Sequence, residues 1–217
     1  SNKTALHYAL EHKDNIEVIK LLLNGGADLQ DNSIFSTATA HQSFEVLNLL
    51  KEFSGTIEIT DPEYVPLIVT AAAENKELNM LLSLIKSGED VNAISKKHSG
   101  GTALHEALTG VNSDNFAMHS MLIGAGADLS AKNKFGRTPL HQACQSGAVE
   151  TTNLIVDTGA DVHQVDDAGN TPLTLACRSI APTELISKLI ESGADPNHLQ
   201  EGADGLTPLC CAINSRN

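Results

Sequence analysis

The chain has 217 residues, with 27 acidic and 14 basic side chains, a net charge of −13, no tryptophan and 3% aromatic residues. This acidity argues against binding to nucleic acid, because the phosphate backbone would repel the protein. No stretch approaches the roughly eighteen apolar residues of a membrane span, and no basic-then-apolar signal segment opens the sequence. These features predict a cytoplasmic domain that does not insert into a membrane.

A four-residue motif, Thr-Pro-Leu-His or a close variant, recurs along the chain. Its copies are Thr4-Ala5-Leu6-His7, Thr102-Ala103-Leu104-His105, Thr138-Pro139-Leu140-His141, Thr171-Pro172-Leu173-Thr174 and Thr207-Pro208-Leu209-Cys210. A second marker, Gly-Ala-Asp, begins at Gly26, Gly126, Gly159 and Gly193, with Gly88-Glu89-Asp90 as a variant. A repeat of 33 residues from Thr138 to Thr171 is typical of stacked two-helix units.

Each unit places apolar residues at helical spacing between the two markers. Residues 18–23 and 185–190 are two such runs, and each predicts the wide apolar face of a packed helix. The marker glycine falls where a helix ends in a left-handed residue. The motif proline falls in a first helical turn, where its missing N–H costs nothing.

This combination resembles the ankyrin repeat, most closely over residues 138–170. The resemblance implies an all-α solenoid of stacked helix-turn-helix units with projecting β-hairpin fingers. It covers essentially the whole chain as one array. The expected repeats are 1–32, 33–64 (degenerate), 65–100, 101–136, 137–169, 170–205 and the truncated 206–217. The abrupt start and end suggest a piece of a longer protein.

The motif histidines His7, His105 and His141 are interpreted as structural, because an array has no need of several identical active sites. The resemblance implies that each bonds its own threonine hydroxyl and a backbone carbonyl of the next repeat. Thr174 and Cys210 replace this histidine in the last two repeats, which predicts a softer junction there.

Catalytic and metal-binding patterns are absent from the sequence. His105-Glu106 lacks the second histidine of a zinc-binding helix, no G-x-S-x-G or phosphate-binding loop occurs, and the cysteines lack metal-ligand spacing. Cys144 and Cys177 occupy one small-residue position in successive repeats, and stacked helices stand too far apart for a disulfide. We therefore expect no catalytic site, no metal and no cofactor, and a reducing compartment.

In ankyrin arrays the partner is commonly gripped by fingertips and by the exposed face of the first helix. Carried over by position, the candidate binding residues are Lys96, Lys97, His98, Lys134, Phe135, Arg137, Gln145, Ser146, Asp167, Asn170 and Arg178. Two adjacent fingers are basic on an acidic protein, whereas the finger with Asp166 and Asp167 is acidic. One interpretation is that these basic side chains are merely solvated and have no binding role. The alternative is that they bind an acidic, extended segment of a partner protein.

Asn92 lies eight residues after Leu84 in a setting that resembles the hydroxylated asparagines of ankyrin repeats. The alternative is an ordinary asparagine that stabilises the base of a finger.

The leading functional expectation is a non-catalytic scaffold, adaptor or substrate receptor that binds another protein. Two alternatives share the fold: the cytosolic regulatory array of a membrane channel or signalling enzyme, and a module of a secreted effector or toxin. The fold alone does not rank them.

Overall fold

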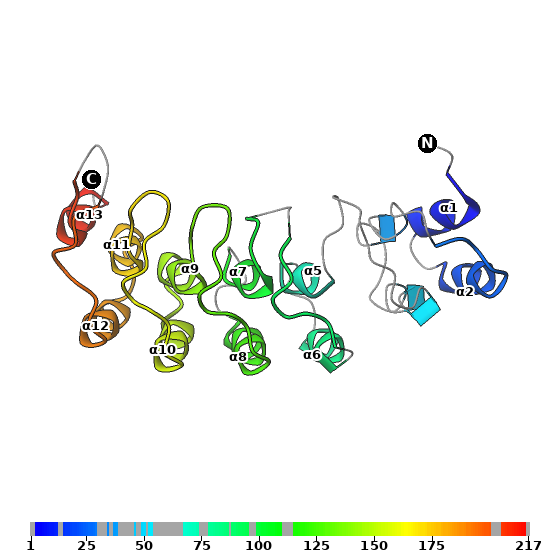
Figure 1. The fold of residues 1–217 in the computed structure, drawn as a ribbon, viewed down its shortest axis with the longest axis horizontal. Helices are drawn as coiled ribbons and strands as arrows, with labels where there is room; N and C mark the ends of the chain where they lie inside the picture. Colours follow the sequence, from blue (N-terminus) through cyan, green and yellow to red (C-terminus); the bar gives the residue numbers. More distant parts are fainter. Residues whose placement is uncertain are drawn as a thin grey trace.

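The computed structural model describes residues 3–12, 15–29, 34, 37–38, 46, 49–50, 52–53, 67–73, 78–86, 88–95, 99–109, 115–200 and 205–215. Within them the chain forms an elongated array of helices with the two termini at opposite ends (Figure 1). The helices are α1 (Ala5–Glu11), α2 (Ile16–Asn24), α5 (Leu67–Ala73), α6 (Leu78–Lys86), α7 (Ala103–Ala107), α8 (Phe116–Gly124), α9 (Pro139–Ser146), α10 (Val149–Asp157), α11 (Pro172–Arg178), α12 (Thr183–Glu191) and α13 (Pro208–Asn214).

The helices form two rows, which Figure 1 shows end-on. The first helices of the repeats, from α5 through α7, α9 and α11 to α13, pack one on the next, and the second helices α6, α8, α10 and α12 do the same. The first helices other than α13 also pack on their own second helices, in the pairs α1–α2, α5–α6, α7–α8, α9–α10 and α11–α12. This arrangement confirms the expected all-α solenoid. The expected second repeat, 33–64, lies largely outside the described residues, and the repeat boundaries stay a prediction.

The first helices begin as the motif predicts. Thr138 stands in extended conformation before α9, its side chain and that of His141 cap each other's backbone, and Pro139 fills the first helical position. An N-cap of this kind stabilises a helix by about 1 kcal/mol. The marker glycines after α8, α10 and α12 all have positive φ angles, as a left-handed helix stop requires: Gly126, Gly159 and Gly193.

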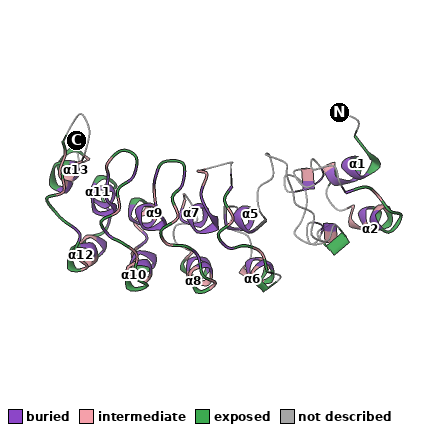
Figure 2. Cartoon of the chain, in the orientation of Figure 1, coloured by how far each residue is buried: buried purple, intermediate pink, exposed green. Residues whose placement is uncertain are grey.

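The core runs the length of the array between the two rows of helices. Figure 2 shows the buried residues gathered where the rows face each other, with the exposed residues outside. Fully buried side chains such as Leu104, Leu122, Leu140 and Ile155 come from both rows, and each contributes about 1.5–3 kcal/mol by leaving water. Over the described residues the buried side chains form this elongated layer, and the loops and the outer faces of the helices are exposed.

Candidate protein-interaction surface

The loops that precede α9 and α11 are built on one pattern. In the first, the Asn133 N–H donates to the Arg137 carbonyl at 2.9 Å, and the Asn133 side-chain oxygen accepts from the N–H of Phe135. In the second, Asp166 and Asn170 take the corresponding places, with a backbone bond of 3.0 Å. These are tight turns. The described residues contain no strand, so the expected β-hairpin form of the fingers is not confirmed, and "finger" here means the loops 131–137 and 164–170.

Adjacent fingers bond to each other through the backbone. The Lys134 N–H donates to the Ser99 carbonyl at 3.1 Å, and the Asp167 N–H donates to the Phe135 carbonyl at 3.0 Å. The approach is so close that a Cβ atom on Gly136 would lie 2.2 Å from Oδ1 of Asp167. The loops 131–137 and 164–170 are therefore linked to each other, and the first is also linked to Ser99, which preorganises them and lowers the entropy cost of binding a partner.

Phe135 projects from this surface with 49% of its area exposed. The Lys134 ammonium lies 5.3 Å from the centre of the phenyl ring, and the Arg137 guanidinium lies 5.8 Å from it. Both distances allow cation–π attraction, worth about 0.5–1 kcal/mol each at an exposed site. The three side chains, named here the fingertip cluster, combine an exposed apolar ring with two positive charges.

Arg137 is held in place from below. Its Nε donates to Oδ2 of Asp166 at 3.1 Å, and its NH1 donates to Oε1 of Gln145 on α9 at 2.8 Å. The Asp166 carboxylate is buried. Burial alone would raise the pKa of Asp166, but hydrogen bonds from Asn170, Arg137 and the Ala168 N–H outweigh it and lower that pKa. Arg137 thus links two fingers and one helix.

The motif histidines fix the fingers to the helices. His105 contacts the Thr102 hydroxyl through Nδ1 at 3.0 Å and the Arg137 carbonyl through Nε2 at 2.9 Å. His141 makes the same pair of bonds to Thr138 at 2.9 Å and to the Asn170 carbonyl at 3.0 Å. The predicted structural role of these histidines is confirmed. Burial lowers the pKa of both imidazoles because it disfavours the charged form.

Comparison with known proteins agrees with this architecture. A profile described as "Ankyrin repeats (3 copies)" matches residues 68–163 and 111–200, which together span more than half of the chain, and the "Ankyrin repeat" profile matches residues 1–33. The chain belongs to the ankyrin-repeat family. Ankyrin repeats are non-catalytic protein–protein interaction modules, which agrees with a site made of surface rather than of a catalytic cleft.

Two relatives are similar over most of the ankyrin array. The nuclear factor NF-kappa-B p105 subunit of Gallus gallus is 35% identical over 154 residues, which cover 67% of this chain and 15% of the relative. The B-cell lymphoma 3 protein homolog of Mus musculus is 30% identical over 146 residues, which cover 64% of this chain and 32% of the relative. This chain therefore corresponds to a minor part of either relative.

The predicted site residues differ in how far they are exposed to solvent. Lys96, Lys97 and His98 lie outside the described residues. Asp167 is exposed at a fingertip, and Arg178 is exposed at the end of α11, where its NH2 lies 3.4 Å from Oε1 of Gln200. Gln145 is exposed on α9 and Ser146 is half-buried beside it.

Asn170 does not belong to the exposed surface. It is 1% exposed, and its amide nitrogen donates to both carboxylate oxygens of Asp166 at 2.9 and 3.0 Å. Asp166 is buried as well. Of the two aspartates in the finger predicted to be acidic, Asp167 is therefore the exposed one. The hydrogen bonds of Asn170 to Asp166 lie within one loop, so the Asn170 side chain is turned toward Asp166 and away from a partner.

Asn92 bridges the third and fourth repeats. Its amide nitrogen donates to the Gly126 carbonyl at 3.1 Å, and its oxygen accepts from the Asp128 N–H at 2.7 Å. This geometry supports the structural interpretation of Asn92; its hydroxylation stays a prediction.

Two polar residues that sequence reasoning missed also hold the array together. His119 is buried in α8, where Nδ1 contacts the Thr151 hydroxyl at 2.7 Å and Nε2 contacts the Ala107 carbonyl at 3.0 Å. Glu106 is buried in α7 and accepts from both the N–H and the hydroxyl of Ser99. For His119, the available sequence signal was a histidine within an otherwise apolar helical run. No sequence signal marked Glu106 as a structural residue.

The four cysteines are free thiols: Cys144, Cys177 and Cys211 are buried, and Cys210 is exposed. Burial raises the pKa of Cys144 and Cys177, so both stay protonated.

Of the helices that the structure describes, none is long and apolar enough to cross a membrane.

Proposed function

We propose that this ankyrin array is a scaffold, adaptor or substrate receptor that captures an acidic, extended segment of a partner protein at its fingertips. The fingertip cluster carries the proposal: a half-exposed phenyl ring flanked by two cations within 6 Å, on a protein of net charge −13. A partner carboxylate would pair with Lys134, and an apolar partner side chain would cover Phe135. Aromatic anchors of this kind dominate the energetics of many interfaces.

The roles of the three residues differ in this proposal. Lys134 is exposed, and its positive charge attracts the acidic partner segment. Arg137 is committed to Asp166 and Gln145, so it positions the ring and adds to the local field. We place this interaction in the cytoplasm, a reducing compartment, which suits the four free thiols.

Charge reversal tests the proposal. Binding of a fluorescein-labelled peptide of alternating glutamate and leucine is measured by fluorescence anisotropy at several salt concentrations. Lys134→Glu should raise the dissociation constant about tenfold, because it removes one attractive pair and adds one repulsive pair. The triple variant Lys96→Glu, Lys97→Glu, Lys134→Glu should weaken binding further and flatten its salt dependence.

Lys86→Glu is the matched control, since it makes the same charge change at the exposed end of α6, away from the fingers. It should alter the dissociation constant less than twofold. Equal effects of Lys86→Glu and Lys134→Glu would assign binding to net charge and refute a fingertip site. An unchanged dissociation constant for Lys134→Glu would refute it as well.

A further inference from the structure

A second surface lies at the opposite end of the first helices from the fingers. A depression of about 410 Å³ lies at the N-terminal ends of α8, α10 and α12. Its lining residues are Phe116, Gly147, Ala148, Val149, Glu150, Thr151 and Glu184. The fingers directly precede α9, whereas Gly147 directly follows it. The depression is therefore separated from the fingertip cluster by the length of α9, about 12 Å.

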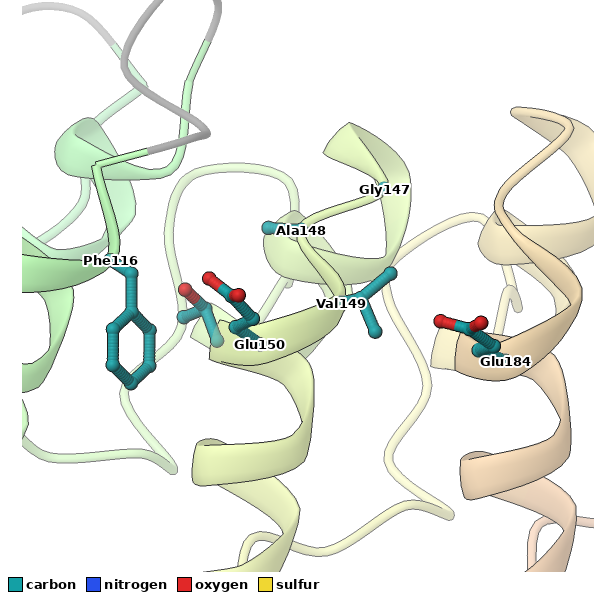
Figure 3. A pocket seen from close by; sticks show the side chains of 7 residues that line it. Phe116, Gly147, Ala148, Val149, Glu150 and Glu184 are labelled. Carbon is teal, nitrogen blue, oxygen red and sulfur yellow. The ribbon is translucent and has the colours of Figure 1, made fainter.

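Apolar and acidic side chains alternate along this depression. Figure 3 shows Phe116, Glu150, Val149 and Glu184 in that order from α8 to α12. Phe116 is 39% exposed, Val149 is half-buried, and both glutamates are exposed. The lining contains two carboxylates and no lysine or arginine. We name these four residues the helix-start row.

Helix stability accounts for the glutamates, and packing against the core accounts for Val149, but neither accounts for Phe116. A carboxylate in a first helical turn interacts favourably with the helix dipole, and Glu150 and Glu184 both stand there. Phe116 gains nothing comparable from exposure to water. The neighbouring turn presents a further apolar side chain, Ile180, which is 58% exposed.

Ile180 has a φ angle of 57°, a left-handed conformation that is unfavourable for a β-branched residue. The preceding repeat has Gly147 at the corresponding position, also left-handed. The two turns are in contact, because a Cβ on Gly147 would lie 3.5 Å from Cδ of Pro182. The exposed apolar surface thus continues past the depression to the next turn.

We propose that the helix-start row docks an extended segment of a partner protein in which apolar and basic residues alternate at every second position. Phe116 and Glu184 are two helix spacings apart, about 16–20 Å. In an extended chain, residues i and i+6 are about 20 Å apart and point to the same side. The order apolar, basic, apolar, basic at i, i+2, i+4 and i+6 then matches the four residues of the row.

The charges favour this occupant. Each helix start carries about half a positive charge from its dipole, and the two carboxylates at the starts of α10 and α12 together outweigh the three helix starts. The resulting negative potential attracts lysine or arginine and repels the acidic segment expected at the fingertips. The two surfaces therefore select opposite charges, and this proposal goes beyond the fingertip function.

The probe is the labelled peptide acetyl-Leu-Ser-Lys-Ser-Leu-Ser-Lys-amide, titrated with the whole array by fluorescence anisotropy. The double variant Glu150→Gln, Glu184→Gln should raise the dissociation constant roughly fivefold or more, because two ion pairs are lost. Glu191→Gln, an exposed charge at the other end of α12, should leave it within twofold. Thermal unfolding monitored by circular dichroism verifies that each variant is folded.

The decisive experiment exchanges the charges on the array and on the peptide. With Lys134→Glu present in both proteins to suppress fingertip binding, the variant Glu150→Lys, Glu184→Lys should bind the same peptide with glutamate in place of both lysines, and the array with its native glutamates should not. Three results would overturn the proposal: no binding of the lysine peptide to the wild-type array up to about 1 mM, equal binding of a peptide with both lysines adjacent, or equal losses for the double variant and Glu191→Gln.

Discussion

At the scale of single residues, the geometry of His105 and His141 requires neutral imidazoles. A carbonyl can only accept, so Nε2 of His141 must carry the hydrogen that bonds the Asn170 carbonyl. Nδ1 is then the acceptor for the Thr138 N–H at 3.2 Å. A second proton on Nδ1 would face that N–H and break the cap. The same argument holds for His105 with Thr102.

This tautomer makes the array less stable in acid. Burial lowers the pKa of His105 and His141 in the folded state, whereas in the unfolded chain they titrate near 6.5. Below about pH 6.5 the unfolded state binds more protons, so the free energy of unfolding falls as the pH falls. The loss is at most about 1.4 kcal/mol per pH unit for each histidine. Urea unfolding at pH 7.5 and 5.5 measures it.

Replacing His141 separates this effect from general acid sensitivity. The variant His141→Leu should be less stable by about 2–4 kcal/mol at pH 7.5, because three buried hydrogen bonds of the imidazole are lost, to the Thr138 N–H, the Thr138 hydroxyl and the Asn170 carbonyl. It should also show a smaller stability difference between the two pH values. His163→Leu, which changes an exposed histidine, is the control. Equal pH dependence of the wild type and His141→Leu would contradict the mechanism.

At the scale of elements, the fingers depend on close contact between neighbours. Gly136 has a φ angle of 69°, and a Cβ there would lie 2.8 Å from the backbone nitrogen of Asp167. That nitrogen cannot retreat without losing its bond to the Phe135 carbonyl. Gly136→Ala should therefore cost about 2–3 kcal/mol, from backbone strain and from the clash together.

Gly159→Ala isolates the strain alone, because its φ angle is 100° and a Cβ there meets nothing within 4 Å. It should cost about 1 kcal/mol and leave binding of the acidic peptide unchanged. Gly136→Ala should weaken that binding, since it disturbs the backbone that carries Phe135. Urea unfolding and peptide anisotropy measure the two effects. Equal destabilisation by both variants would contradict the steric argument.

The sequence predicted the helices because they are set by residues within one repeat, whereas the histidine contacts were predicted through the resemblance to ankyrin repeats. It predicted the lateral contacts poorly. Arg137 and Asp166 are 29 residues apart, and their pairing depends on how closely two fingers stack. Asn170, predicted to face a partner, is instead buried beside Asp166 by hydrogen bonds within its own loop. Side-chain type identified the candidate surface, but only the geometry separated exposed Lys134 and Phe135 from the residues that support them.

At the scale of the whole molecule, a solenoid has no single core, so its stability is a sum over repeats and the interfaces between them. The interface between the last two repeats lacks the histidine bond. Thr174 contacts Thr171 through its hydroxyl at 2.9 Å, a side chain too short to reach the next finger. The loop before α13 is joined to the loop before α11 by a different bond, because the Gln200 amide donates to the Ala168 carbonyl at 2.8 Å.

Thr174→His tests whether the missing bond softens this end of the array. By analogy with His141 and Asn170, the new imidazole would reach the Leu206 carbonyl, which occupies the corresponding place before Thr207. The added bond should stabilise the last interface by about 1 kcal/mol. Amide hydrogen exchange in α13 should then slow about fivefold, while exchange in α9 stays the same. Unchanged exchange in α13 would show that the contacts of Gln200 already hold the junction as firmly as a motif histidine does.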